Sequence, residues 1–376
     1  MSIFNILKIK SQKSCLGVDL GSSSIKIVEL CQDLKGIELR TYGLAKFKMD
    51  DIKKDPVAQQ EKFAAVLAKL CVDSKIITRN AIASLPPFFV FSSITSLPEM
   101  SKEDMESAVQ WEAKKVIPLP IEQIELKWRI INIKNNEQKS KQKSGEQENN
   151  KKKENKKVQV LLTGAAKKLI QRYIYVFRRA GLNLCSLETE SFALSRSLSN
   201  ENDKSVVMIV DIGALNTNIA IIKLGIPFLN KSIDIGSITI SKIIANSLNI
   251  SIERAEQFQY DIGVNLGRER NNISIPKIVE DALSSIINEI KYSFNLYEEY
   301  KGSILEPDDK IEKVILCGGG ATIPNLSEYL SELLNIKVYI RDPWTKLQYP
   351  NELKMILQEI GPNFAVAIGL AMRHFV

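Results

Sequence analysis

Two short segments of the sequence carry the same arrangement of acidic, glycine and small polar residues. Asp19-Leu-Gly-Ser-Ser-Ser-Ile-Lys and Asp211-Ile-Gly-Ala-Leu-Asn-Thr-Asn each follow an apolar stretch, and they begin 192 residues apart in a chain of 376. Gly21 and Gly213 allow a tight backbone turn that can approach a bound oxyanion closely. One copy alone is compatible with an ordinary β-turn and a capping aspartate. The repetition indicates a duplicated domain in which each half contributes one turn to a shared cleft.

The other residues of these turns are suited to binding phosphate, because their hydroxyl and amide groups and backbone N–H groups can donate hydrogen bonds. Asp19 and Asp211 are expected to face each other across the cleft and to hold Mg²⁺ through water molecules that the ion retains. The predicted nucleotide-binding residues of the two turns are Asp19, Gly21, Ser22, Ser23, Ser24, Lys26, Asp211, Gly213, Asn216 and Thr217.

A third segment, Val314-Ile-Leu-Cys-Gly-Gly-Gly-Ala-Thr, is an apolar stretch that leads into three glycines. A helix is expected to follow, and the loop permits close approach of a nucleoside or phosphate to a helix N-terminus. The glycines alone are a weak signal, but the order of the three segments is a strong one. No GxxxxGK[ST] motif of a P-loop competes with it. This segment adds Gly318, Gly319, Gly320 and Ala321 to the predicted nucleotide-binding residues.

Apolar periodicity predicts the elements that position these segments. Strands are expected to alternate with helices, which indicates an α/β fold. The expected strands cover residues 16–18, 24–30, 81–85, 88–97, 124–133, 158–163, 184–187, 206–210 and 314–316, and a further strand is expected after the second turn, as 24–30 follows the first. The expected helices cover 55–72, 169–180, 190–198, 240–248, 252–262, 277–300, 325–334 and 364–372, and another begins at Ser101 and stops before Pro118.

Composition excludes several kinds of protein. No stretch approaches the roughly 20 apolar residues of a membrane-spanning helix, and the N-terminus lacks the features of a secretory signal. The five cysteines include no CxxC pair, and His374 is the only histidine. A Cys/His metal site and a Ser–His–Asp triad are therefore close to excluded, and a soluble protein in a reducing cytoplasm is expected.

The positive charge is concentrated in one segment. Residues 134–157 hold nine lysines and four acidic residues, a balance of +5 within a net charge of +7. The segment is almost free of apolar side chains, which predicts a disordered, solvated loop. It also lacks the interleaved aromatic residues that stack on nucleic-acid bases, so nucleic acid is not an expected partner.

The three motifs resemble the phosphate-1, phosphate-2 and adenosine loops of the actin-like ATPase superfamily, whose lobes have a ribonuclease H-like fold. Within it, the chain resembles the type IV pilus assembly proteins of the PilM family. The resemblance is carried by DLGSSSIKIVEL, by Leu97-Pro-Glu-Met with Trp111-Glu-Ala-Lys-Lys-Val-Ile-Pro, and by Arg179-Ala-Gly-Leu with Glu190-Ser-Phe-Ala-Leu. The lysine-rich loop and the sequence Asn216-Thr217-Asn218 depart from the family pattern.

The resemblance implies two duplicated α/β lobes with an inserted subdomain of the kind found in the cell-division protein FtsA. The first-lobe core is expected at 1–92 and 184–203, and the insert at 93–183. The second-lobe core is expected at 204–239 and 310–376, with a smaller subdomain at 240–309.

The resemblance also implies roles for charged residues outside the three loops. Glu188, or alternatively Glu190, occupies the place of the group that orients the attacking water, although both could be glutamates at a helix start. Glu289 and Lys291 correspond to positions that contact adenine or ribose, although they could equally form a solvated helix face.

The function implied is a cytoplasmic ATP- and Mg²⁺-binding scaffold with slow or no ATP hydrolysis. It would belong to the inner-membrane complex of a type IV pilus, or of a related type II secretion-like system, with self-association left open. The expected partner is the N-terminal tail of PilN, bound between the first-lobe core and the insert. Phe88, Val90, Phe91, Ile94 and Trp111 are candidates for that groove, although core packing also accounts for each of them. The apolar segment Ile3–Lys10 resembles such a peptide, so self-occupation of the groove is a further hypothesis.

Two other functions on the same fold are the alternatives. A sugar or small-molecule kinase needs a base carboxylate beside a polar pocket, and no distinct motif for one is present. An FtsA-like filament protein ends in an amphipathic membrane helix after a linker, whereas this sequence stops at Met372-Arg-His-Phe-Val, directly after its last expected core helix.

Overall fold

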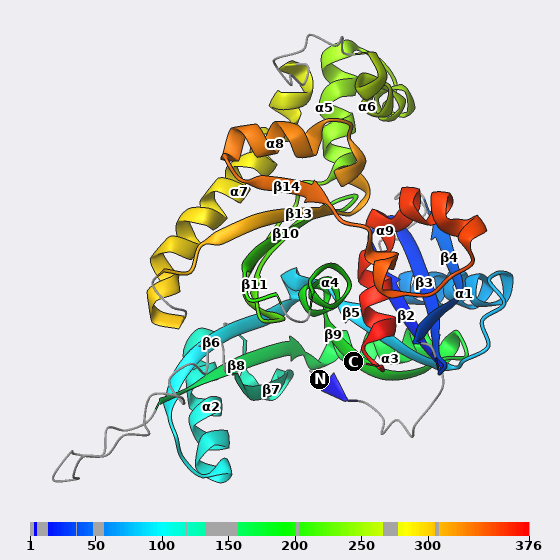
Figure 1. Ribbon diagram of the computed structural model, residues 1–376. Coiled ribbons are helices and arrows are strands. Elements are labelled where there is room, and N and C mark those ends of the chain that lie inside the picture. The colour runs from blue at the N-terminus through cyan, green and yellow to red at the C-terminus, as the bar shows by residue number, and fades with distance from the viewer. Residues whose placement is uncertain are drawn as a thin grey trace.

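The computed structural model describes residues 4–5, 14–34, 36–47, 56–117, 119–131, 157–200, 203–265, 277–304 and 308–375. These residues form three sheets with flanking helices (Figure 1), which confirms the predicted α/β class. Most of the lysine-rich segment predicted to be disordered, residues 134–156, lies outside the described ranges.

The first sheet is built around an antiparallel meander. Strand β2 pairs with β3 and β3 with β4, while β5 runs parallel to β2 and β9 runs parallel to β5. Helices α1 and α3 pack against each other over this sheet, burying Leu67 and Phe177. The elements are β1 (Phe4–Asn5), β2 (Ser14–Leu20), β3 (Ser24–Gln32), β4 (Ile37–Lys46), α1 (Pro56–Asp73), β5 (Asn80–Leu85), α3 (Lys167–Arg179) and β9 (Asn183–Thr189).

The second sheet repeats this topology. Its order β12-β11-β10-β13-β14 corresponds to β4-β3-β2-β5-β9, with the same antiparallel meander followed by two parallel strands. Strand β10 is apolar and buried over most of its length, as expected for a strand covered on both faces. The elements are β10 (Val206–Ile212), β11 (Thr217–Lys223), β12 (Ile226–Ile233), α5 (Ser237–Leu248), α6 (Ile252–Asn265), α7 (Lys277–Ile304), β13 (Ile311–Cys317), α8 (Leu326–Leu334) and β14 (Lys337–Ile340).

The insert is a separate three-stranded antiparallel sheet backed by one helix. Strands β6 (Val90–Pro98), β8 (Lys157–Ala166) and β7 (Ile124–Ile131) pair in that order, and α2 (Lys102–Val116) buries Met105 and Val109 against them. The sheet therefore spans 90–166, whereas the prediction assigned 93–183 to the insert. The difference is α3, which lies between the two sheets in sequence but packs on α1 of the first lobe.

Two helices join the lobes by crossing between them. Helix α4 (Glu190–Leu198) follows the first sheet in sequence, yet Ala193, Leu194 and Leu198 pack with apolar residues of the second sheet. Helix α9 (Lys354–Met372) follows the second sheet but lies against β2 and β3 of the first. It begins ten residues before the predicted start at 364 and continues through Pro362. Residues 310–376 thus do not belong to the second lobe alone.

The C-terminal segment Asn351–Met372 is long and apolar enough to cross a membrane, but 67% of its apolar 18-residue window is buried inside the protein. This burial is what a core helix of a folded protein shows, and it follows from the contacts of α9 with both lobes.

Candidate functional site

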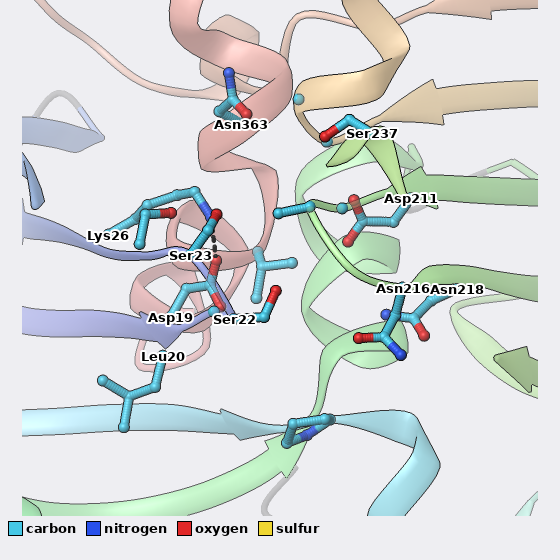
Figure 2. A pocket seen from close by; sticks show the side chains of 18 of the residues that line it. Asp19, Leu20, Ser22, Ser23, Lys26, Asp211, Asn216, Asn218, Ser237 and Asn363 are labelled. Carbon is cyan, nitrogen blue, oxygen red and sulfur yellow. Dashed lines mark hydrogen bonds and ion pairs between the residues drawn. The ribbon is translucent and has the colours of Figure 1, made fainter. Parts of the chain in front are cut away.

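A cavity of about 1820 Å³ lies between the two lobes and is lined by both acid–glycine turns. Figure 2 shows Asp19, Ser22, Ser23 and Lys26 on one side and Asp211, Asn216 and Asn218 on the other. The structure brings together twelve of the residues predicted to bind nucleotide or act on it. They are Asp19, Gly21, Ser22, Ser23, Ser24, Lys26, Glu190, Asp211, Gly213, Asn216, Gly318 and Gly319.

The two turns have matching geometry. A Cβ atom on Gly21 would lie 3.0 Å from the Ser24 carbonyl oxygen, and one on Gly213 would lie 2.9 Å from that of Asn216. Across the strands, Asp19 is the partner of Lys26 and Asp211 is the partner of Asn218. The duplication inferred from the sequence is therefore a duplication of strand, turn and register.

An ion pair links the two strands of the first turn. Lys26 Nζ lies 2.9 Å from Asp19 Oδ2, and both side chains are largely buried. Burial opposes the charge of Lys26, but attraction by Asp19, and then by Asp211 and Glu190, holds its pKa above the usual value. The lysine thus stays cationic at the base of the cavity.

The carboxylates of the site repel one another. Burial raises the pKa of Asp211 to about 6, with Asp19 adding to the shift and Lys26 opposing it. Burial, followed by repulsion from Asp19 and Asp211, raises the pKa of Glu190 well above its usual value. Three carboxylates facing one lysine leave an excess of negative charge that a cation would relieve.

This charge excess fits Mg²⁺. Within the described ranges, no three His, Cys, Asp or Glu side chains come close enough to hold a metal together directly. A hydrated Mg²⁺ needs few direct protein ligands, because it keeps several of its waters. Asp19 and Asp211, on opposite sides of the cavity, are the residues that would hold it.

The glycine-rich loop packs directly behind the second turn. Gly318 has φ +81°, and a Cβ atom there would lie 2.3 Å from Asp211 Oδ1. Its N–H donates to the Pro362 carbonyl at 2.9 Å, which fixes the loop to α9. A short 3₁₀ turn, Gly319–Thr322, follows, and α8 begins only at Leu326. The helix expected at 325–334 is thus confirmed, and this turn separates it from the glycines.

Several predicted residues do not line the cavity. Glu188 is fully buried and accepts from Arg196 at 2.8 and 3.0 Å, with Arg373 Nη1 at 3.4 Å. The Thr217 hydroxyl donates to the Ile235 carbonyl at 2.7 Å. The others are Gly320 and Ala321, which are buried, and Glu289 and Lys291 on α7.

Other cavity residues were not predicted. Asn218 donates to Glu190 Oε2 at 2.9 Å and accepts from the Ser232 hydroxyl at 2.7 Å, which orients the glutamate. Its alignment with Lys26 in the repeat was the available signal. No comparable pattern marks the polar residues of α5, α6 and α9 at the cavity, which include Ser237, Ser241, Lys242, Glu256, Gln259 and Asn363.

The five residues predicted for the partner groove do not share one face. Phe91 packs in the core of the insert, whereas Val90 and Ile94, on the other face of β6, pack against the main core. Phe88 is exposed at the cavity, and its ring contacts Phe89. Trp111 is exposed on α2 beneath the Lys115 ammonium.

Comparison with known proteins gives a consistent result. The pattern of a family described as "Type IV pilus assembly protein PilM" matches residues 17–144 and 145–375. The cell division protein FtsA of Borreliella burgdorferi is 26% identical over 229 residues, which cover 56% of this chain and 53% of that protein. The match thus spans about half the length of this curated relative.

Solved structures share the fold. A structure titled "PilM-PilN type IV pilus biogenesis complex" has a TM-score of 0.76 at 24% identity, covering 96% of this chain and 98% of the other. The ethanolamine utilization protein EutJ from Carboxydothermus hydrogenoformans has a TM-score of 0.53 at 18% identity, covering 98% and 92%. A MamK double helical filament has a TM-score of 0.51 at 12% identity, covering 96% and 98%.

Proposed function

Because this chain belongs to the type IV pilus assembly protein PilM family and has the actin-like ATPase fold, we propose that it is a cytoplasmic ATP-binding scaffold of a pilus inner-membrane complex. The observation that carries the nucleotide proposal is the pair of matching acid–glycine turns on opposite sides of one cavity.

The cavity residues divide into groups that suit the parts of a nucleoside triphosphate. Backbone N–H groups of the turns after Gly21 and Gly213 are suited to phosphate oxygens, and Lys26 supplies positive charge beside them. Ser241, Lys242 and Gln259, on α5 and α6, offer polar contacts for the nucleoside. Mg²⁺ held through water by Asp19 and Asp211 would neutralise charge on the phosphate oxygens.

We assign the water-orienting role to Glu190 in preference to Glu188. Glu190 lines the cavity and is held by Asn218, whereas Glu188 is engaged by the partly buried Arg196 and the buried Arg373. The raised pKa of Glu190 keeps its carboxyl group protonated to a higher pH, and the protonated form cannot accept a proton from water until a cation entering the site lowers that pKa. This supports slow ATP hydrolysis, so ATP would act mainly as a structural ligand.

The proposed partner is the N-terminal tail of a PilN-like membrane protein. Support comes from the family and from the neighbouring structure, whose title names a complex with PilN. Binding of that tail would place the chain at the cytoplasmic face of the inner membrane through its partner. Phe88 and Trp111 are the predicted groove residues that remain exposed.

Thermal unfolding with Mg-ATP tests the nucleotide proposal. A ligand at about 100 times its Kd, binding only the native state, adds roughly 2.7 kcal/mol to the unfolding free energy. We expect this stabilisation in the wild type and its loss in Asp211→Asn. Glu289→Gln, on α7 outside the cavity, is the matched control and should respond like the wild type.

The same assay with a PilN N-terminal peptide tests the partner. Stabilisation by both ligands supports the scaffold. Stabilisation by ATP without any effect of the peptide would favour the kinase alternative. No response of the wild type to Mg-ATP would overturn the nucleotide proposal.

A further inference from the structure

Helix α3 brings a second group of first-lobe side chains to the cavity, in addition to the first turn. Leu169, Arg172, Tyr173 and Val176 line the cavity, and their spacing of three and four residues places them on one face of the helix. Lys168 lines the cavity beside them. Because α3 contains no acidic residue, the polar groups of this wall are two cations and one phenol, which favours an anionic ligand here.

The ring of Tyr173 is packed in the core, whereas its hydroxyl group belongs to the cavity. The side chain is partly buried and packs against the main apolar core. Tyrosine often joins an apolar body to a polar tip in this way, and a buried hydroxyl usually has a hydrogen-bond partner. This hydroxyl has none among the residues that the structure describes. The phenol is therefore a positioned donor that is available to a ligand.

Two carboxylates of the site locate the Tyr173 hydroxyl and keep it neutral. Burial raises the pKa of Tyr173, and repulsion from Glu190 and then from Asp19 raises it further. Both carboxylates line the same cavity as the tyrosine. The hydroxyl thus lies toward the first turn and the start of α4, and it keeps its proton and can donate it in a hydrogen bond.

This location corresponds to one end of a bound nucleotide. The side chains assigned to the nucleoside, which are Ser241, Lys242 and Gln259, belong to α5 and α6 of the second lobe. Tyr173 belongs to the first lobe and lies in the surroundings of Glu190, to which we assign the attacking water. A phosphate chain that extends from the nucleoside toward Glu190 would bring its last phosphate to Tyr173.

We propose that the Tyr173 hydroxyl donates a hydrogen bond to the terminal phosphoryl group of a nucleoside triphosphate, and that the cavity thereby prefers a triphosphate to a diphosphate. This inference rests on the proposed nucleotide binding. The phosphoryl oxygens supply an acceptor for the phenol, and Lys168 and Arg172 stand on the same wall. A hydrogen bond to a charged acceptor contributes about 10-fold to affinity. A diphosphate ends one phosphate earlier and leaves the hydroxyl without this acceptor.

The contact would also tie α3 to the ligand. Helix α3 begins at Lys167, directly after strand β8 of the insert ends at Ala166, and it packs on α1. With a diphosphate in the cavity, α3 is held by packing alone, whereas a triphosphate adds a hydrogen bond from its middle. The local stability of α3 should therefore differ between the two ligands.

Binding of Mg-ADP and of the non-hydrolysable triphosphate Mg-AMPPNP to the full-length protein, measured by isothermal titration calorimetry, tests the assignment. We expect Tyr173→Phe to weaken binding of Mg-AMPPNP by about 10-fold and to leave binding of Mg-ADP nearly unchanged. Phenylalanine keeps the packed ring and removes only the hydroxyl. Tyr175→Phe is the matched control on the same helix, since the Tyr175 hydroxyl donates to Glu61 outside the cavity, and both affinities should stay at the wild-type values.

Amide hydrogen exchange provides a second measurement that begins with the unchanged protein. Residues 167–179 of the wild type should exchange more slowly with Mg-AMPPNP than with Mg-ADP, and this difference should disappear in Tyr173→Phe. An equal loss of affinity for both nucleotides in Tyr173→Phe, or no loss for either, would overturn the role of Tyr173 and leave the nucleotide proposal intact. A wild type that binds neither nucleotide would overturn both.

Discussion

Glu188 and Glu190 stand two positions apart, yet the fold gives them opposite surroundings. The carboxylate of Glu188 lies between the guanidinium groups of Arg196 and Arg373, and the residue is fully buried. Glu190 lines the cavity, and its partner is the neutral amide of Asn218. The first is a structural anion, and the second is available to a ligand.

We predict that Glu188→Gln lowers the free energy of unfolding by about 3–5 kcal/mol, because it leaves buried arginine charge without its counter-ion. Glu190→Gln should cause little loss, since a carboxyl group with a strongly raised pKa is already partly neutral and glutamine has the same shape. Chemical denaturation without ligand measures both. Comparable destabilisation by the two variants would contradict the assigned surroundings.

Asp211 makes stability depend on pH. Its pKa is about 6 in the folded protein against an ordinary value of 3.8, so between these values the folded state binds more protons than the unfolded state. The contribution of this group to the free energy of unfolding therefore falls as the pH rises from about 4 to about 6, and it does not change further above that range. We predict that, without Mg²⁺, Asp211→Asn is more stable than the wild type at pH 7.5 by about 1–2 kcal/mol.

The control for this prediction is pH itself. At pH 4.5 the wild-type carboxyl is largely protonated in the folded state, so the advantage of Asp211→Asn should shrink. Unfolding curves at several pH values measure the difference in stability between the two proteins. If the advantage of Asp211→Asn grew toward low pH, the raised pKa assigned to Asp211 would be contradicted.

Helices α4 and α9 set the spacing of the lobes by direct backbone contact. A Cβ atom on Gly369 of α9 would lie 1.9 Å from the Ala193 carbonyl oxygen of α4, and one on Gly17 of β2 would lie 2.0 Å from that of Ala367. Both distances are far below van der Waals contact. The two glycines therefore allow α9 to lie against α4 on one side and the first sheet on the other.

We predict that Gly369→Ala destabilises the protein by about 3 kcal/mol, because α4 and α9 must move apart to admit the methyl group. Gly302→Ala is the matched control, since nothing lies within 4 Å of a Cβ atom at this position near the end of α7. It should raise the unfolding free energy by about 0.5–1 kcal/mol through helix propensity. Thermal or urea unfolding compares the two, and a neutral Gly369→Ala would refute the close crossing.

The molecule as a whole combines two lobes of repeated topology with an insert on the first lobe (Figure 1). Most of its net positive charge lies in residues 134–157. Only Lys157 of this segment lies within the described ranges, and the strands on either side pair directly, with Ile131 opposite Gln159. The ends of the segment are thus close enough for a short connection.

We predict that replacing residues 134–156 with a six-residue Gly/Ser linker leaves the thermal midpoint and the Mg-ATP response nearly unchanged. Shortening the loop changes the entropy of loop closure only slightly, since that entropy varies slowly with loop length. Differential scanning calorimetry with and without Mg-ATP measures both. Loss of the ATP response would show that the lysine-rich segment takes part in nucleotide binding.

The sequence alone was sufficient for the three loops and for most helices and strands. Each acid–glycine turn is formed by residues that are neighbours in the sequence. The turn leaves no room for a side chain at the glycine, so its residue types are constrained and the repeat can be recognised from the sequence. Strands β4, β12 and β14 were missed, because they carry polar or exposed residues and their pairing, not their composition, makes them strands.

Tertiary structure alone decided which charged residues belong to the cavity. Glu188 and Glu190 are indistinguishable in sequence, and their roles separate only because Arg196 and Arg373 reach one of them. The crossing of α4 and α9 brings together residues more than 170 positions apart, such as Ala193 and Gly369. Local patterns predict turns, helices and strands because those depend on neighbouring residues, whereas burial and ion pairing depend on residues that only the folded chain brings together.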